Sequence, residues 1–291
     1  MEKPKKPVKR PRKVPRAPEP ELRAYRMTVA YKGSEYQGWQ KQSVAGGPPT
    51  VQEMIESAAR KILKSKKVLI HGSGRTDSGV HARAQVAHLR APIDLPASTL
   101  IKAINAHLPE DIRLLRLEDC APDFHAQLDV KTKTYRYFIL NTKTGKDPMH
   151  WPFLRPYTWF VTYPLDLEKM RIALAALEGT HDFKSFQNKG TPVPDTVREI
   201  LSAKLIEHNG DPREQPPWMP GPEFEARLLE IRVKGTGFLK QMVRTIAGTV
   251  VEVGRGKIDP QEIEKILAQK NRSASGMTAP AQGLFLDHVE Y

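Results

Sequence analysis

The chain has 291 residues, of which 39% are hydrophobic and 27% charged, with a formal net charge of +13. This composition is typical of a soluble globular protein, and no apolar run approaches the roughly 20 residues that a membrane helix needs. The single cysteine, Cys120, excludes an intramolecular disulfide and a multi-cysteine zinc site, and it fits a reducing compartment such as the cytoplasm.

The positive charge is concentrated at the N-terminus but not confined to it. Residues 1–16 hold eight Lys or Arg and one Glu, which is +7 of the total +13 and leaves +6 on the remainder. Residues 1–22 have few large apolar groups, so we expect a disordered basic tail, with no apolar segment of the kind that marks a secretory signal. The basic remainder indicates a polyanionic partner such as nucleic acid, although solubility alone would also explain it.

Segments of strand and helix character follow the tail in two similar series. Residues 50–53, T-V-Q-E, have the spacing of a capping box at a helix start. The first series has strands at 26–31, 67–70, 83–89 and 112–117, with helices beginning near 50 and 96. The second has strands at 134–140, 197–206, 224–233 and 284–291, with helices at 165–177, 237–254 and 260–267. An exposed loop is expected at 208–223.

This repetition predicts an α+β protein made of two ferredoxin-like units. We place the N-terminal subdomain at 23–125 and the C-terminal subdomain at 126–291. Adjacent sheets of two such units could join into one larger sheet with a cleft between them.

The loop at 72–82, between two predicted strands, is the densest group of chemical side chains. It holds the carboxylate Asp77, the guanidinium Arg75 and the flanking His81 among three glycines. Two interpretations fit: a functional site carried by a loop, or an ordinary turn in which Asp77 bonds to nearby amides.

Two aromatic positions leave similar alternatives open. The strand at 131–140 places Tyr135 on one face beside basic residues, where it would stack on a nucleobase or simply pack in the core. Trp39, in the loop before the first helix, would likewise be a stacking surface or an anchor of that loop.

Arg244 lies within the apolar stripe of the helix predicted at 237–254. An arginine drawn toward the interior must meet a carboxylate or a phosphate. Patterns for a zinc helix, a serine nucleophile elbow, a Walker loop and a dinucleotide-binding fingerprint are all missing. Asp77 is therefore the best remaining candidate for chemistry.

Taken together, these motifs resemble the tRNA pseudouridine synthase A (TruA) family in order and spacing over residues 26–291. The matching segments are Y-K-G-S-E-Y-Q-G-W-Q at 31–40, G-R-T-D-S-G-V-H at 74–81, K-T-Y-R-Y at 133–137, G-F-L-K-Q-M-V-R-T-I-A-G at 237–248, V-E-V-G-R-G-K at 251–257 and T-A-P-A-Q-G-L-F-L at 278–286.

The resemblance implies a pseudo-twofold pair of ferredoxin-like subdomains that form a continuous, mostly antiparallel sheet, with helices on one face and a central active-site cleft. It implies isomerisation of uridine to pseudouridine in the anticodon stem-loop of tRNA, at tRNA positions 38, 39 and 40, by a cytoplasmic homodimer without metal or cofactor. Asp77 matches the catalytic nucleophile, Tyr135 the tyrosine that packs on the target base, and Arg75 and Arg244 the arginines near them.

Two positions depart from the family pattern: Ser78 replaces a usual alanine, and Lys240 a common aromatic residue. Neither removes a group that the reaction needs, but Lys240 puts the fine site preference in doubt. Two other functions fit some of these sequence features. A non-catalytic RNA-binding or chaperone protein would use the same basic cleft without needing Asp77. A base-excising hydrolase usually needs a second positioned carboxylate, and none stands out near Asp77.

Overall fold

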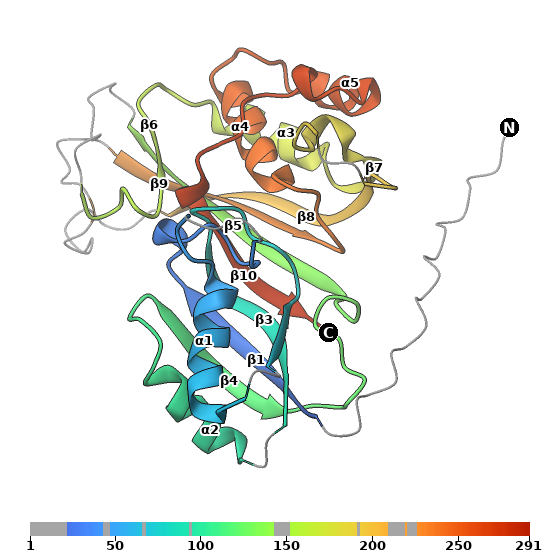
Figure 1. Cartoon of the computed structure of the whole chain (residues 1–291). Helices are drawn as coiled ribbons and strands as arrows, with labels where there is room; N and C mark the ends of the chain where they lie inside the picture. The colour runs from blue at the N-terminus through green and yellow to red at the C-terminus, as the bar shows by residue number, and fades with distance from the viewer. Residues whose placement is uncertain are drawn as a thin grey trace, which may run out of the picture.

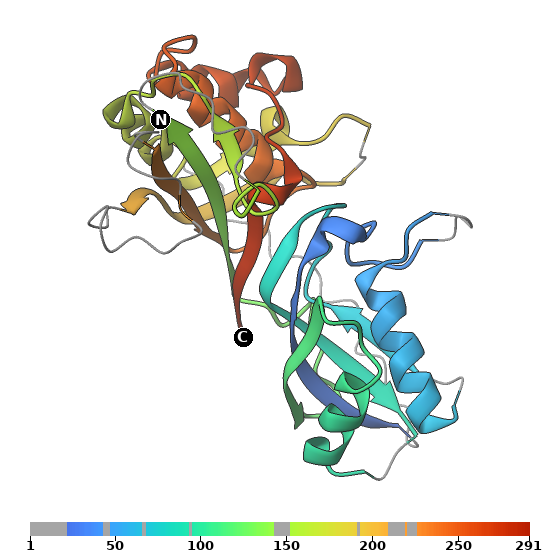
Figure 2. The ribbon, with the colours of Figure 1, turned by 90° about the vertical axis from the view of Figure 1, so that its left-hand side faces the viewer.

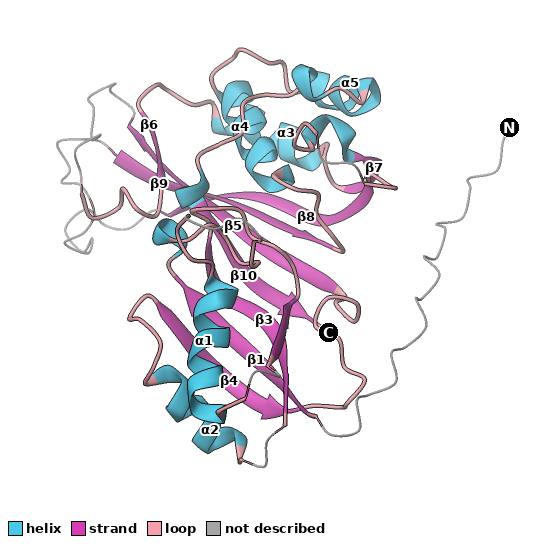
Figure 3. Cartoon of the chain, viewed as in Figure 1, coloured by secondary structure: helices cyan, strands magenta, loops and turns pink. Residues whose placement is uncertain are grey.

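The computed structural model describes residues 22–42, 47–65, 68–92, 95–142, 152–190, 193–208, 219 and 226–291. Within them the chain is α+β, as predicted, with α-helices set against one large sheet (Figure 1; Figure 3). The strands are β1 (Arg23–Tyr31), β2 (Leu69–Gly72), β3 (His81–Ala91), β4 (Ile112–Asp119), β5 (Thr132–Thr142), β6 (Trp159–Val161), β7 (Gly179–Asp182), β8 (Val197–His208), β9 (Ala226–Gly235) and β10 (Leu284–Glu290). The helices are α1 (Val51–Leu63), α2 (Ala97–Asn105), α3 (Leu167–Ala175), α4 (Met242–Gly254) and α5 (Glu262–Gln269).

The first helix, α1, begins where the local sequence predicts. Thr50 Oγ1 accepts a hydrogen bond from the Glu53 amide at 3.3 Å, and the Glu53 carboxylate accepts one from the Thr50 amide at 2.9 Å. This is the expected capping box, which satisfies two amides at the start of the helix. Val51, Ile55 and Ala58 are buried, so the apolar spacing also identified the face of α1 that packs in the core.

The C-terminal strand β10 joins the two halves into one sheet. The strand order is β4-β1-β3-β10-β5-β9-β8-β7, with β2 added to β3 and β6 added to β5. Strand β10 pairs in parallel with β3 and antiparallel with β5. Among the described strands the only other parallel pair is β5 with β6. The expected continuous, mostly antiparallel sheet is confirmed.

One row of side chains crosses this sheet from the first half to the second. Residues paired across neighbouring strands point to the same face of a sheet. The row consists of Tyr31, Ala82, Leu286, Tyr135, Val233 and Ala203. All six are buried, so they form a continuous floor that both halves share.

The helices gather in two groups on either side of this junction. Helices α1 and α2 contact each other and lie beside β1, β3 and β4, whereas α3, α4 and α5 lie beside the strands of the second half (Figure 1). Figure 2 shows the two groups at opposite ends of the molecule, with β10 between them. None of the helices in the described residues is long and apolar enough to cross a membrane.

Several predicted boundaries differ from the structure. The helix expected at 237–254 begins only at Met242, because Gln241 has a left-handed backbone with φ 61° and the chain before it turns. Phe238 keeps the helical spacing of apolar residues although it is not helical, which explains the error. Strands β6 and β7 were not predicted, since three or four residues are too few to show a period.

Parts of the predicted organisation fall outside the described residues. These parts are the basic tail except for Leu22, and most of the loop expected at 208–223. The division of the chain after residue 125 stays a prediction.

Candidate active site

The loop that contains Asp77 connects β2 to β3, as the sequence predicts. The Val80 amide donates a hydrogen bond to the Asp77 carbonyl at 3.2 Å, which closes a tight turn. Gly79 within this turn has φ 78°, and a Cβ atom there would lie 3.1 Å from the Ala281 side chain. A glycine is therefore needed at this position, and the loop has a defined shape.

Residues before α1 hold this loop against the first half of the sheet. The Trp39 amide donates to the Thr76 carbonyl at 3.2 Å, and Ser78 Oγ donates to the Tyr36 carbonyl at 3.1 Å. The Tyr31 hydroxyl is 2.8 Å from Thr76 Oγ1. Trp39 is only 2% exposed, so of its two possible roles the structure shows the anchor in the core.

Asp77 lies against Arg244, which comes from the first turn of α4. An Nη atom of Arg244 is 3.3 Å from the Asp77 carboxylate, and its Nε donates to the Ala279 carbonyl at 2.8 Å. The Arg244 side chain is 14% exposed and the Asp77 side chain is 21% exposed. The interior arginine thus meets a carboxylate, as its place in an apolar stripe required.

Tyr135, on β5, belongs to the row of buried side chains that crosses both halves of the sheet. Its ring packs edge-on against Phe238, with centroids 5.0 Å apart, and it is 7% exposed. Burial raises the pKa of the Tyr135 hydroxyl, and the nearby Tyr31 and Asp77 raise it further. The hydroxyl therefore remains protonated at neutral pH.

Arg75 lies in the same loop as Asp77 but is exposed. Within the described residues the ion pair of Asp77 is made with Arg244 and not with Arg75. Arg75 is therefore near Asp77 in the chain without forming an ion pair with it. Arg75 instead lines a cleft as an exposed residue.

All four predicted site residues line one cleft of about 2030 Å³ between the two halves. Asp77 and Arg75 come from the first half, and Tyr135 and Arg244 from the second. Among the described residues of the lining, six side chains are cationic and three are anionic. The cleft therefore has a positive balance that suits an anionic substrate.

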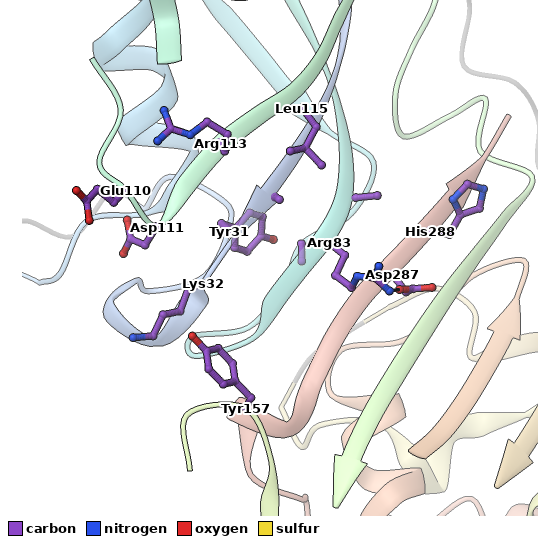
Figure 4. Close-up of a pocket in the computed structure, with 13 residues that line it drawn as sticks. Tyr31, Lys32, Arg83, Glu110, Asp111, Arg113, Leu115, Tyr157, Asp287 and His288 are labelled. Carbon is purple, nitrogen blue, oxygen red and sulfur yellow. Dashed lines mark hydrogen bonds and ion pairs between the residues drawn. The ribbon is translucent and has the colours of Figure 1, made fainter. Parts of the chain in front are cut away.

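A separate hollow of about 860 Å³ contains none of these four residues. Figure 4 shows its mixed charge: Arg83 is paired with Asp287 at 2.8 Å, and Tyr157 lies beside Lys32. Nothing in it matches a single class of ligand. In the described part of the chain, no three His, Cys, Asp or Glu side chains are arranged to hold a metal ion.

The sequence profile of the tRNA pseudouridine synthase family matches residues 27–129 and 173–291. The chain belongs to this family. The tRNA pseudouridine synthase A of Bacillus pumilus is 43% identical over 265 residues, which cover 91% of this chain and 97% of the relative. The protein of the same name from a Thermoanaerobacter species is 38% identical over 270 residues, covering 93% of this chain and 100% of the relative. Membership confirms the predicted family and the prediction of a tRNA-modifying isomerase.

Solved structures give a much weaker likeness. An H/ACA ribonucleoprotein bound to a substrate RNA containing 2'-deoxyuridine is 12% identical, with a TM-score of 0.32, over 78% of this chain and 44% of that chain. This likeness carries no argument about the site.

His81, the last residue of the motif G-R-T-D-S-G-V-H, has a structural role. The Gly33 amide donates to His81 Nδ1 at 3.0 Å, so Nε2 carries the proton and donates to the Pro156 carbonyl at 2.9 Å. The ring stacks on Phe285 with centroids 4.6 Å apart. Burial lowers the pKa of His81, so the ring is neutral and fixes the start of β3.

Sequence reasoning missed three residues that shape the cleft of this family member. Phe238 supports Tyr135, Gln85 donates to the Gly74 carbonyl at 2.9 Å, and Lys133 donates to the Ser73 carbonyl at 2.6 Å. Lys133 precedes Tyr135 by two positions, so the strand period already placed the two on one face. No local pattern marks Gln85, because its role depends on a loop that folds back onto β3.

Proposed function

We propose that this chain converts uridine to pseudouridine in the anticodon stem-loop of tRNA, at tRNA positions 38, 39 and 40, with Asp77 as the nucleophile. The observation that carries the proposal is the pairing of Asp77 with Arg244 in a cleft of positive balance that Tyr135 also lines. Family membership supports the reaction, and the motif resemblance supports the tRNA positions.

The reaction cleaves the bond between C1' and N1 of uridine and forms a bond between C1' and C5. The proton on C5 is lost and N1 gains one, so the product is an isomer and no redox cofactor takes part. The Asp77 carboxylate attacks the substrate, while Arg244 holds that carboxylate in place.

The target base must first leave the stack of the stem-loop, which costs a few kcal/mol. Arg75, which is exposed and lines the cleft, fills the space that the base leaves. Tyr135 supports the face of the extruded base, since aromatic rings stack on bases. In this proposal the first half contributes Asp77 and Arg75, and the second half contributes Tyr135 and Arg244.

We also propose that the protein acts as a cytoplasmic homodimer with subdomains at 23–125 and 126–291. The motif resemblance supports the dimer, and the single cysteine supports a reducing compartment. Light scattering of the purified protein tests the dimer directly: a monomeric mass at working concentration would contradict it.

The central test replaces Asp77 by asparagine, which keeps the shape and removes the charge. We expect Asp77→Asn to bind tRNA with unchanged affinity and to form no pseudouridine at positions 38 to 40 in a mapping experiment. Asp195→Asn is the matched control, because that carboxylate also lines the cleft but is half-exposed and lies beside Arg198. Normal turnover by Asp77→Asn would show that Asp77 is not the nucleophile, whereas no pseudouridine formation by the wild-type protein would leave the chain as a non-catalytic RNA-binding protein.

A further inference from the structure

Lys133 is a cleft residue that the proposed chemistry leaves without a role. It lies on β5 two residues before Tyr135, on the same face of the strand, and lines the same cleft. Its Nζ donates to the Ser73 carbonyl at 2.6 Å, and a Cβ atom on Gly74 would lie 2.6 Å from that Nζ. The ammonium group therefore sits directly against the backbone that leads to Asp77.

Within the described residues, Lys133 has no carboxylate within ion-pair distance. Asp77, a carboxylate of the same cleft, is paired with Arg244. An ammonium has three donors, and the Ser73 carbonyl takes one of them. Burial lowers the pKa of Lys133 to about 8, since one neutral carbonyl does not replace the lost water.

A purely structural role does not account for this charge. The neighbouring carbonyl, that of Gly74, is held at 2.9 Å by the neutral amide of Gln85. A neutral donor is therefore sufficient to fix this part of the loop. A cation that is partly removed from water is costly unless an anion meets it. The balance of six cations and three anions along the cleft leaves that anion to the substrate.

We infer that Lys133 binds a backbone phosphate of the substrate RNA beside the target nucleotide and, through the Ser73 carbonyl, positions the loop of Asp77. Two residues along a strand span about 7 Å, so Lys133 reaches past the base over Tyr135 toward the adjoining backbone. Lys133 is thus a positioning residue and touches no reacting atom. The inference rests on the proposed function, because it needs RNA in this cleft.

The first test measures how tightly an unmodified tRNA transcript binds, at salt concentrations from about 50 to about 200 mM. Lys133→Met should weaken binding about tenfold, as expected for the loss of a hydrogen bond to a charged group. It should also lower the slope of log affinity against log salt by roughly 0.7 to 0.9, which is one phosphate contact. The control is Lys204→Met, an exposed lysine outside the cleft lining, which should behave as wild type.

The second test uses pH and a variant that keeps the charge. Because the ammonium must be protonated to hold a phosphate, wild-type affinity should fall about tenfold between about pH 7 and about pH 9. Lys133→Arg stays charged throughout this range, so its affinity should show a flatter pH profile with an undiminished salt slope. Comparison with wild type removes the contribution of the RNA's own titration.

The inference is overturned if Lys133→Met keeps the wild-type affinity and salt slope, or if Lys133→Arg keeps the wild-type pH profile. A lowered melting temperature with unchanged binding would likewise show that Lys133 only supports the fold. These readouts do not depend on turnover, whereas the Asp77→Asn test does. Failure of one proposal can therefore be told from failure of the other.

Discussion

The Arg244 guanidinium lies 3.3 Å from the Asp77 carboxylate, although the two residues are 167 positions apart in the chain. Asp77 is carried by a loop of the first half and Arg244 by α4 of the second. The contact exists because β10 joins the two halves into one sheet and the Ala279 carbonyl, just before β10, holds Arg244 at 2.8 Å. Asp77 and Arg244 are therefore brought together by the whole fold.

Arg244→Gln should lower kcat/KM for tRNA by about 10- to 100-fold, the loss expected when a charged hydrogen-bond partner is removed. Arg244→Lys should recover only part of this, because one ammonium cannot reproduce the fork that reaches both Asp77 and Ala279. Arg116→Gln, at an exposed arginine on β4, controls for loss of charge. Wild-type kcat/KM in Arg244→Gln would show that the pair has no part in turnover.

Local sequence was sufficient for elements whose determinants are local. The capping box of Thr50 and Glu53 fixed the start of α1, and alternation along β5 placed Tyr135 on a buried face. It was insufficient at α4, where apolar Phe238 extends the helical spacing into a turn. The short strands β6 and β7 exist only through their partners, so no pattern within them could reveal them.

In the site, too, local sequence indicates some features, whereas others depend on contacts between distant residues. An arginine in an apolar stripe indicated that Arg244 needs an anion, but the anion's identity depends on pairing across 167 residues. The polar groups that cluster in the loop of Asp77 include His81. Its structural role depends on Gly33 and Pro156, which are distant in sequence. Density of polar residues identifies a site without separating its reactive groups from its supports.

Arg75→Ala should reduce turnover without affecting stability. Arg75 is exposed and has no ion pair with Asp77, so its removal takes little from the folded protein. If Arg75 fills the space of the extruded base, its loss should slow single-turnover conversion by roughly 10- to 100-fold, a few kcal/mol. Thermal unfolding should stay within about 1 °C of wild type. A large drop in melting temperature with normal conversion would reverse this assignment.

At Tyr135, two substitutions can separate the contribution of the aromatic ring from that of the hydroxyl. The hydroxyl has no hydrogen-bond partner within the described residues, and Tyr135 lines the cleft, so the proposed substrate could supply that partner. Tyr135→Phe should keep tRNA affinity within about twofold and lower the single-turnover rate by about tenfold or more. Tyr135→Leu should also weaken binding, because it removes the stacking surface. Equal rates for Tyr135→Phe and wild type would leave the hydroxyl without a function.

A buried carboxylate on the sheet makes stability depend on acid pH. Glu230 is fully buried and accepts hydrogen bonds from Arg136 at 2.9 and 2.7 Å, from Arg232 at 2.7 Å and from His208 at 2.9 Å. Burial alone would raise the pKa of Glu230, but the bonds from Arg136, Arg232 and His208 lower it to about 2. Folding therefore favours the charged form.

The sign of the pH effect follows from this lowered pKa. The stabilisation is complete above the ordinary pKa of 4.5 and is lost as the pH falls through that value toward about 2. Glu230→Gln should cost about 3 kcal/mol of unfolding free energy at neutral pH, because Arg136 and Arg232 lose their anion. It should also flatten the fall in stability below about pH 4.5.

Urea unfolding of both proteins at neutral and acid pH measures these two effects together. Glu118→Gln is the matched control, because its partner Arg26 and Glu118 itself are both 38% exposed, and such surface pairs contribute less than about 1 kcal/mol. If Glu230→Gln unfolded like Glu118→Gln at neutral pH, the charges around Glu230 would contribute no net stability to the folded protein.

Arg136, a partner of Glu230, also lies 3.5 Å from Asp287 on β10. Loss of the stabilisation at Glu230 would therefore extend to the strand that joins the two halves. Glu230→Gln should then lower the cooperativity of unfolding as well as the midpoint, since the two halves would no longer be held to one transition.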